Sequence, residues 1–141
     1  MPMTAPDAPS PIFELPIRIY YEDTDAAGVV YYANYFKFFE RCRTEWIRRL
    51  GREPLPGRGN PIFIVRKASA EYLKSGHLDD EIIIRLEIER LGRSTTVFRQ
   101  YVFRGEEKLV QGVIETVCVD PDTLKSIPVP GWLREQVSTP G

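Results

Sequence analysis

One segment of the chain repeats its apolar residues with the period of an α-helix. Charged residues fill the positions between them, as on a helix with one buried face. This pattern predicts a helix from Asn34 to Leu50, with Asn34 as its N-cap and Gly51 just beyond its end. The apolar stripe consists of Tyr35, Phe38, Phe39, Cys42, Trp46 and Leu50.

Most of the remaining chain alternates apolar and polar residues, which is typical of β-strands with one buried face. Short turns join the later strands and therefore indicate antiparallel hairpins. One strand is expected before the helix, four after it, and a helical turn near the C-terminus. The strands are predicted at 17–21, 62–73, 81–91, 94–103 and 108–119, and the helical turn at 132–137. The fold class is α+β, with the sheet curled around the helix.

The proline-rich start of the chain lacks the apolar segment of a targeting peptide. We expect a loose tail from Met1 to Pro16, with residues 1–13 outside the domain and residues 14–137 forming one domain. A loop is expected at Arg52 to Asn60, because prolines and glycines are concentrated there.

The composition of the 141 residues excludes several classes of protein. A net charge of −1 gives no indication of nucleic-acid binding, and no apolar run is long enough for a membrane span. The only cysteines, Cys42 and Cys118, lie far apart and are expected to be packed thiols, which favours the cytoplasm. The single histidine, His77, is expected at the surface of a turn.

These scarce residues also limit the chemistry. No pair of Cys or His residues has the spacing of a zinc site, so no metal site is predicted. A Ser-His or Cys-His hydrolase would have to use His77, which has no nucleophile motif beside it. Acid–base chemistry is therefore expected to rest on carboxylates.

Three carboxylates, those of Glu22, Asp23 and Asp25, lie between the first strand and the helix. Unpaired backbone N–H groups at a helix start can stabilise an oxyanion, and a nearby carboxylate can act as nucleophile or general base. Together they would suffice to hydrolyse an activated ester. The same acidic residues could equally form a solvated turn or cap the helix, and the pattern alone does not decide between these interpretations.

The segment from Asp23 to Tyr35 has the pattern D-x-D-x-x-G-V-V-Y-Y-x-N-Y and continues into F-F-E-R-x-R-T-E. This motif resembles the hotdog-fold acyl-CoA thioesterases of the 4-hydroxybenzoyl-CoA thioesterase type, and most closely their bacterial Tol–Pal-associated branch. The similarity covers about residues 14 to 130, including 63–67, 78–81 and 117–121. It implies the hotdog fold, a five-stranded antiparallel sheet wrapped around one central helix.

The resemblance also implies roles for individual residues. Asp25 would be the catalytic carboxylate, with Asp23 supporting the turn, and the backbone N–H of Tyr32 would polarise the thioester carbonyl. The Tol–Pal-associated branch commonly has a histidine where this chain has Tyr32, so the amide role carries over and a side-chain proton role does not. Glycine at position 28 would permit a conformation or close approach that a side chain hinders. The candidate substrate-binding residues are Gly28, Val29, Tyr31, Asn34 and Arg66.

The function implied is hydrolysis of an acyl-CoA to a carboxylic acid and free CoA, without any cofactor besides the CoA of the substrate. The alternative is a weakly active or non-catalytic hotdog protein that binds acyl carrier protein or a partner in lipid metabolism. A hotdog dehydratase would need a histidine at the site, and His77 lies in a different segment. Hotdog subunits pair edge to edge, so a homodimer or a homotetramer formed from two dimers is expected.

Overall fold

The computed structural model describes residues 11–52 and 61–138, and the elements it contains follow the predicted order. The strands are β1 (Phe13–Arg18), β2 (Ile62–Tyr72), β3 (Glu81–Leu91), β4 (Thr95–Arg104) and β5 (Glu107–Val119). The helices are α1 (Asn34–Arg49) and α2 (Gly131–Ser138), and a short 3₁₀ turn occupies Tyr21–Asp23.

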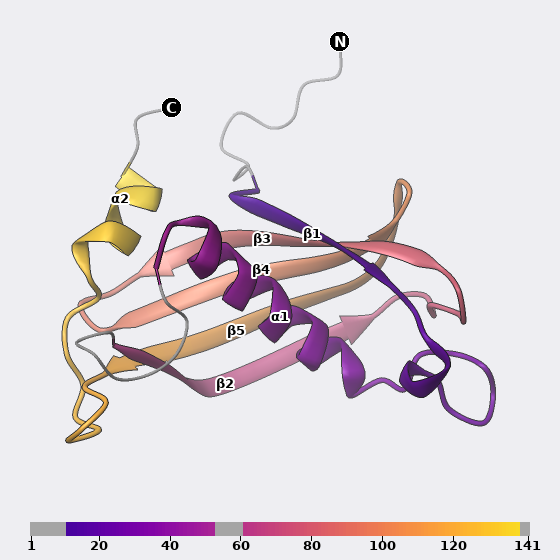
Figure 1. The fold of residues 1–141 in the computed structure, drawn as a ribbon, viewed down its shortest axis with the longest axis horizontal. Coiled ribbons are helices and arrows are strands. Elements are labelled where there is room, and N and C mark those ends of the chain that lie inside the picture. Colours follow the sequence, from indigo (N-terminus) through magenta and orange to yellow (C-terminus); the bar gives the residue numbers. More distant parts are fainter. Residues whose placement is uncertain (1–10, 53–60, 139–141) are drawn as a thin grey trace, which may run out of the picture.

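The strands form one antiparallel sheet in the order β1-β3-β4-β5-β2. Consecutive strands from β3 to β5 are neighbours, whereas β2 pairs with β5 at one edge and β1 pairs with β3 at the other. Helix α1 runs across one face of this sheet (Figure 1). The α+β class and the five-stranded sheet around a central helix are thus confirmed.

The predicted apolar stripe is the face of α1 that packs on the sheet. Its first five members are all buried, and they form one core cluster with Ile84 of β3 and Ile114 of β5. Helix and sheet approach closely at Gly112, where a Cβ atom would lie 2.7 Å from the ring of Phe39. Glycine is therefore needed at this position of β5 to let the helix settle onto the sheet.

The start of the fold differs from the prediction. The first strand is Phe13–Arg18 instead of 17–21, so the loose tail does not extend to Pro16. Proline is tolerated there because β1 is an edge strand and a proline lacks only the N–H that would otherwise be donated. The 3₁₀ turn that begins at Tyr21 ends the extended segment early. The tail before residue 11 and most of the predicted loop at 52–60 lie outside the described residues.

The N-cap prediction was also wrong by one residue. Ala33 precedes the helix without any side-chain cap, and Asn34 is the first helical residue. The Asn34 amide group instead donates a hydrogen bond to the backbone oxygen of Asp23, at 2.9 Å. At the other end, Gly51 has a φ of +80°, as expected of the residue that ends a helix.

The final helix is short, as predicted, and Leu133 of α2 is fully buried. Within residues 11–52 and 61–138, neither helix has the length and apolar character needed to cross a membrane.

Candidate active site

Asp25 opens a tight turn whose shape follows from its sequence, Asp-Ala-Ala-Gly. The Gly28 amide donates to the Asp25 backbone oxygen and the Asp25 amide donates to the Val29 oxygen, each at 2.9 Å. The carboxylate Oδ1 of Asp25 accepts the amide of Ala27 at 2.9 Å, and Gly28 closes the turn with a φ of +80°. Aspartate at the first position and a left-handed glycine at the last are typical of such loops. The side chain of Asp25 is exposed, so water reaches its carboxylate.

Asp23 fixes this turn to the start of α1. Its carboxylate is buried and accepts the amide of Tyr20 at 2.8 Å. Its backbone oxygen accepts both the Tyr31 amide, at 3.0 Å, and the Asn34 side chain. Asp23 and Asp25 therefore have different roles: Asp23 holds the backbone of the turn, and the carboxylate of Asp25 remains accessible to water.

Free backbone donors lie immediately before the first turn of α1. The amides of Asn34 and Tyr35 bond back to the carbonyls of Tyr31 and Tyr32, at 2.8 and 3.4 Å. Between the described residues, no hydrogen bond uses the amide of Tyr32 or that of Ala33. Unpaired amides at a helix start carry the positive end of the helix dipole and favour negative charge nearby.

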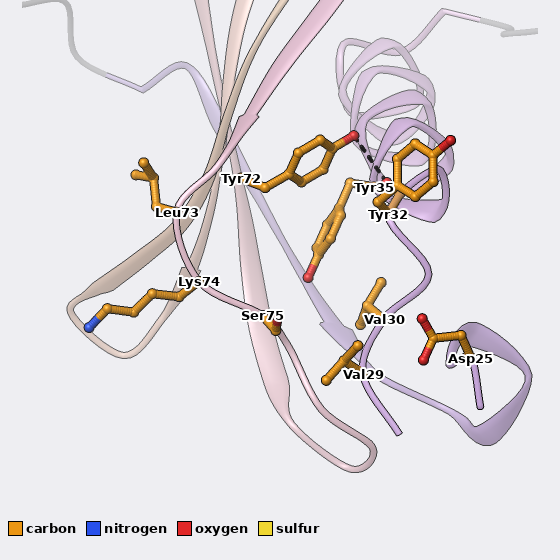
Figure 2. Close-up of a pocket in the computed structure, with 9 residues that line it drawn as sticks. All are labelled: Asp25, Val29, Val30, Tyr32, Tyr35, Tyr72, Leu73, Lys74 and Ser75. Atoms are coloured by element: carbon orange, nitrogen blue, oxygen red, sulfur yellow. Dashed lines mark hydrogen bonds between the residues drawn. The ribbon is translucent and has the colours of Figure 1, made fainter. Parts of the chain in front are cut away.

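A pocket of about 280 Å³ connects Asp25 with this helix start (Figure 2). The Asp25 carboxylate faces Val29 and Val30 at one side of it, and Tyr32, Tyr35 and Tyr72 lie along the other. The remaining lining residues are Leu73, Lys74 and Ser75. The amino group of Lys74 points away from the pocket and pairs with Glu107 at 2.6 Å.

The tyrosines form an aromatic cluster around the helix start. The hydroxyl of Tyr72 donates to the backbone oxygen of Tyr32 at 3.2 Å, and that of Tyr35 accepts the Gly76 amide at 3.0 Å. Burial raises the pKa of Tyr35 and of Tyr72 above the usual range for a phenol. Both hydroxyls therefore remain protonated at neutral pH.

The chain between β2 and β3 supports the turn from the other side. Val30 donates its amide to the Gly76 oxygen at 2.9 Å, and Val29 pairs with His77 in an isolated bridge. Arg104 holds this connection through Asp80, at 2.6 Å, and through the Ser75 carbonyl, at 3.2 Å.

Positive and negative side chains balance one another around this connection between β2 and β3. Partial burial raises the pKa of Asp80, but hydrogen bonds from the His77 amide and from Arg104 outweigh burial, and the net pKa is lowered. Hydrogen bonds from Lys74 and Arg104 lower the pKa of Glu107 to about 2. Both carboxylates are therefore ionised, and their pairing with cationic side chains holds the connection between β2 and β3 in place.

Three of the predicted site residues, Asp25, Val29 and Tyr32, line the pocket. Gly28 shapes the turn, as described above, without lining the pocket. Tyr31 stands beside Tyr32 with ring centres 5.0 Å apart, and Asn34 is engaged with Asp23.

Arg66 lies away from this pocket. Its guanidinium pairs with Glu115 across the sheet at 2.8 Å, next to a bulge in β2. Arg66 therefore has an ion-pair partner on the neighbouring strand at this edge of the sheet.

Sequence reasoning did not single out Tyr72 or the hydroxyl of Tyr35 as parts of the site. A signal for Tyr72 existed, because it shares the alternating face of β2 with Ala68 and Ala70. Alternation does not say which element a side chain contacts, so this signal could not identify Tyr32 as the partner of Tyr72.

The other reactive side chains are as expected. Cys42 and Cys118 are buried free thiols, and burial raises the pKa of Cys42 to about 12 and that of Cys118 to about 11. Both are therefore protonated at neutral pH and poor nucleophiles. The His77 side chain is exposed, although its backbone lies beside the turn. Across the two described stretches, no group of three or more His, Cys, Asp or Glu residues is arranged to hold a metal ion.

Comparison with known proteins agrees with this geometry. Residues 27–111 match the family described as the Thioesterase superfamily. The Acyl-CoA thioester hydrolase YbgC of Escherichia coli O6:H1 is 39% identical over 122 residues, covering 84% of this chain and 90% of the relative. The Acyl-CoA thioesterase YbgC of Haemophilus influenzae is 36% identical over 120 residues, covering 84% and 88%.

A solved structure gives the same result. The probable thioesterase from Bartonella henselae superposes with a TM-score of 0.78 at 31% identity, over 83% of this chain and 98% of that chain. The family match begins within the Asp25 turn, runs through α1 and includes most of the sheet. The chain therefore belongs to the thioesterase superfamily and is a thioester hydrolase with the hotdog fold.

Proposed function

We propose that this chain hydrolyses acyl-CoA thioesters in the pocket between Asp25 and the start of α1. The observation that supports this most directly is that Asp25, with its accessible carboxylate, and Tyr32, with its unbonded backbone amide just before the helix, line one cavity. A thioester carbonyl placed between them would meet a base or nucleophile on one side and hydrogen-bond donors on the other. The names of the bacterial relatives support acyl-CoA as the substrate class.

Two routes use the same groups. In the first, the oxygen of a water molecule attacks the carbonyl carbon while Asp25 takes a proton from that water. The amide of Tyr32 stabilises the oxyanion that forms. In the second, the carboxylate itself attacks and forms an anhydride, which water then hydrolyses. In both, the tetrahedral centre collapses, the C–S bond breaks and the CoA sulfur leaves with the electron pair, to be protonated by solvent.

Neither route requires a metal or a redox cofactor, because a thioester is already activated and its sulfur is a good leaving group. We propose that CoA enters only as part of the substrate. The Tyr32 side chain is not assigned a proton-transfer step, since its phenol lies at the rim of the pocket and its amide supplies the hydrogen bond. We propose that Val29, which lines the pocket, and Tyr31, whose ring lies beside that of Tyr32, border the path of the acyl group.

The test is thiol release from a panel of short, long and aromatic acyl-CoAs by wild type and Asp25→Asn. Asparagine keeps an Oδ1 atom for the Ala27 amide, so the turn is preserved while charge and basicity are lost. We expect kcat to fall by about 10²- to 10⁴-fold, the range for a removed general acid or base. Glu22→Gln is the matched control, because Glu22 is an exposed carboxylate in the same segment outside the pocket.

Equal rates for wild type and Asp25→Asn would refute the assignment of Asp25. A folded wild type that releases no thiol from any member of the panel would favour the alternative, a hotdog protein that binds acyl carrier protein or another partner. Direct titration with an acyl carrier protein would then be the relevant measurement.

We also propose that two copies pair along β2. This strand is an edge of the sheet, and an unpaired edge offers backbone hydrogen-bonding groups to a second chain. Side-by-side pairing would extend the sheet and place Arg66 of β2 near the interface, and we propose that it meets the CoA phosphates there. Two such dimers would form the homotetramer.

The free, buried thiols of Cys42 and Cys118 support a reducing compartment. We therefore propose that the protein works in the cytoplasm, where acyl-CoA is available to it.

A further inference from the structure

We propose that Tyr72 is a positioning residue for this reaction: its hydroxyl holds the carbonyl of Tyr32 and thereby orients the amides that receive the thioester oxygen. The inference rests on the function proposed above. It concerns a residue of the edge strand that is forty positions away from Tyr32 in the sequence.

The contact is well defined. Tyr72 is the last residue of β2, and its hydroxyl donates to the Tyr32 oxygen at 3.2 Å, the dashed line in Figure 2. The two rings meet edge to face with centres 5.9 Å apart, and the Tyr72 ring lies 5.8 Å from that of Tyr35. The ring is thus supported on two sides, which aims the hydroxyl at the helix start.

The helix start needs such support. Ala33, at the N-cap, supplies no side-chain hydrogen bond, so the common stabilisation of a first turn is missing. From the backbone of α1, the Tyr32 carbonyl accepts only a long bond, from the Tyr35 amide at 3.4 Å. The Tyr72 hydroxyl is its second donor, and this donor comes from the sheet, which is independent of the helix turn that it holds.

Fixing this carbonyl also fixes the donors. The Tyr32 oxygen and the Ala33 amide belong to one planar peptide group, so holding one end determines where the other points. The same bond restricts the ψ angle of Tyr32 and so limits how far the first turn can fray and carry the Tyr32 amide out of line. A hydrogen bond to the carbonyl also polarises the peptide group and strengthens its N–H as a donor.

This role has a kinetic signature. The thioester oxygen carries more negative charge in the transition state than in the bound substrate, so a misaligned donor costs more in the transition state. Loss of the Tyr72 hydroxyl is therefore expected to lower kcat and leave KM nearly unchanged. A hydroxyl that simply bound the acyl group in the ground state would raise KM instead.

The experiment compares Tyr72→Phe with wild type on the acyl-CoA that wild type hydrolyses best. Phenylalanine keeps the ring and its edge-to-face contacts and removes only the hydroxyl. We expect kcat to fall by about 3- to 10-fold, the equivalent of one neutral hydrogen bond, with KM changed by less than about 2-fold. Tyr101→Phe is the matched control, because Tyr101 lies on β4 and outside the pocket, with its ring against Lys108 and Phe103.

A second readout does not depend on activity. Hydrogen exchange of the Tyr35 amide, which bonds to the Tyr32 carbonyl, is expected to accelerate several-fold in Tyr72→Phe and to stay unchanged in Tyr101→Phe. Unchanged exchange, an unchanged kcat, or a raised KM at constant kcat would each overturn the role of Tyr72. Full activity of Asp25→Asn would instead refute the proposed catalytic carboxylate, so the two failures are distinguishable.

Discussion

The position of Asp25, the proposed catalytic carboxylate, depends on backbone conformation more than on side-chain contacts. Asp25 has one hydrogen bond to its side chain, from the Ala27 amide, and the turn around it is closed by Gly28. A φ of +80° places Gly28 in the left-handed region, which a Cβ atom disfavours by about 1–2 kcal/mol. Among the described residues, no atom beyond its two chain neighbours lies within 4 Å of the place where that Cβ would be, so the cost is one of backbone conformation alone.

Gly28→Ala is therefore expected to destabilise the protein by about 1 kcal/mol and to lower kcat, because the turn relieves its strain by moving Asp25. Gly28→Asn is the matched variant, since asparagine adopts the left-handed conformation more readily than other side chains. We expect it to retain more of both stability and activity. Thermal unfolding and thiol release measure the two effects, and an alanine variant equal to wild type would show that the turn does not position Asp25.

At this scale, sequence reasoning identified the residues that are close to each other in the chain. The pattern of a short turn followed by a helix start predicted only carboxylates near free amides, and the resemblance to hotdog thioesterases then implied Asp25 and the Tyr32 amide; both residues line the one pocket. Tyr72 comes from a distant strand, and its approach to Tyr32 depends on how β2 packs beside α1, which no local pattern encodes. Arg66 was selected for its charge, but the structure pairs it with Glu115 on the neighbouring strand.

Among the elements, the contact between α1 and β5 determines how closely the helix lies on the sheet. The ring of Phe39 occupies the space that a side chain at position 112 would fill. The helical period of the sequence predicted that Phe39 would be buried, and the structure confirms it. The helical period did not predict which strand receives the Phe39 ring, because it specifies the buried face of the helix and not the strand that packs against it.

Gly112→Ala is expected to reduce the free energy of unfolding by about 1–3 kcal/mol, the usual effect of an overpacked core. The added methyl group would lie 2.7 Å from the Phe39 ring, so the ring or the helix must move. Gly131→Ala, in open space at the start of α2, controls for the general effect of replacing glycine. Urea unfolding of both variants measures the difference, and equal midpoints would show that α1 adjusts to the extra atom without cost.

Element boundaries were predicted less well than element types. Alternation identified all five strands, but the first was placed four residues late because Pro16 was taken as part of a loose tail. An edge strand accepts a proline, and edge position is a property of the complete sheet order. The one-residue error at the start of α1 has a similar origin, since the Asn34 side chain bonds to Asp23 instead of capping its own helix.

At the scale of the whole molecule, β2 forms one edge of the sheet. Strand β2 is long and largely exposed, and it carries apolar side chains such as Ile64 and Val65. Long exposed edges with apolar residues promote pairing with another chain unless charge or proline protects them. The proposed dimer would cover these residues and place a second chain beside β2, the strand whose last residue, Tyr72, lines the pocket.

Val65→Lys is therefore expected to weaken self-association about tenfold or more, because it places a charge in the apolar edge that would be buried between two chains. Val137→Lys is the matched control: the two valines are 45% and 43% exposed, but Val137 lies on α2 and belongs to no strand of the sheet. Sedimentation velocity over a dilution series gives the dissociation constants, and thiol release on the same samples tests whether the dimer is the active form. A wild type that stays monomeric at micromolar concentration, or two lysine variants that dissociate alike, would argue that β2 is not the interface. If Val65→Lys alone dissociates and its activity falls in proportion to the remaining dimer, the edge strand joins the two active sites into one functional unit.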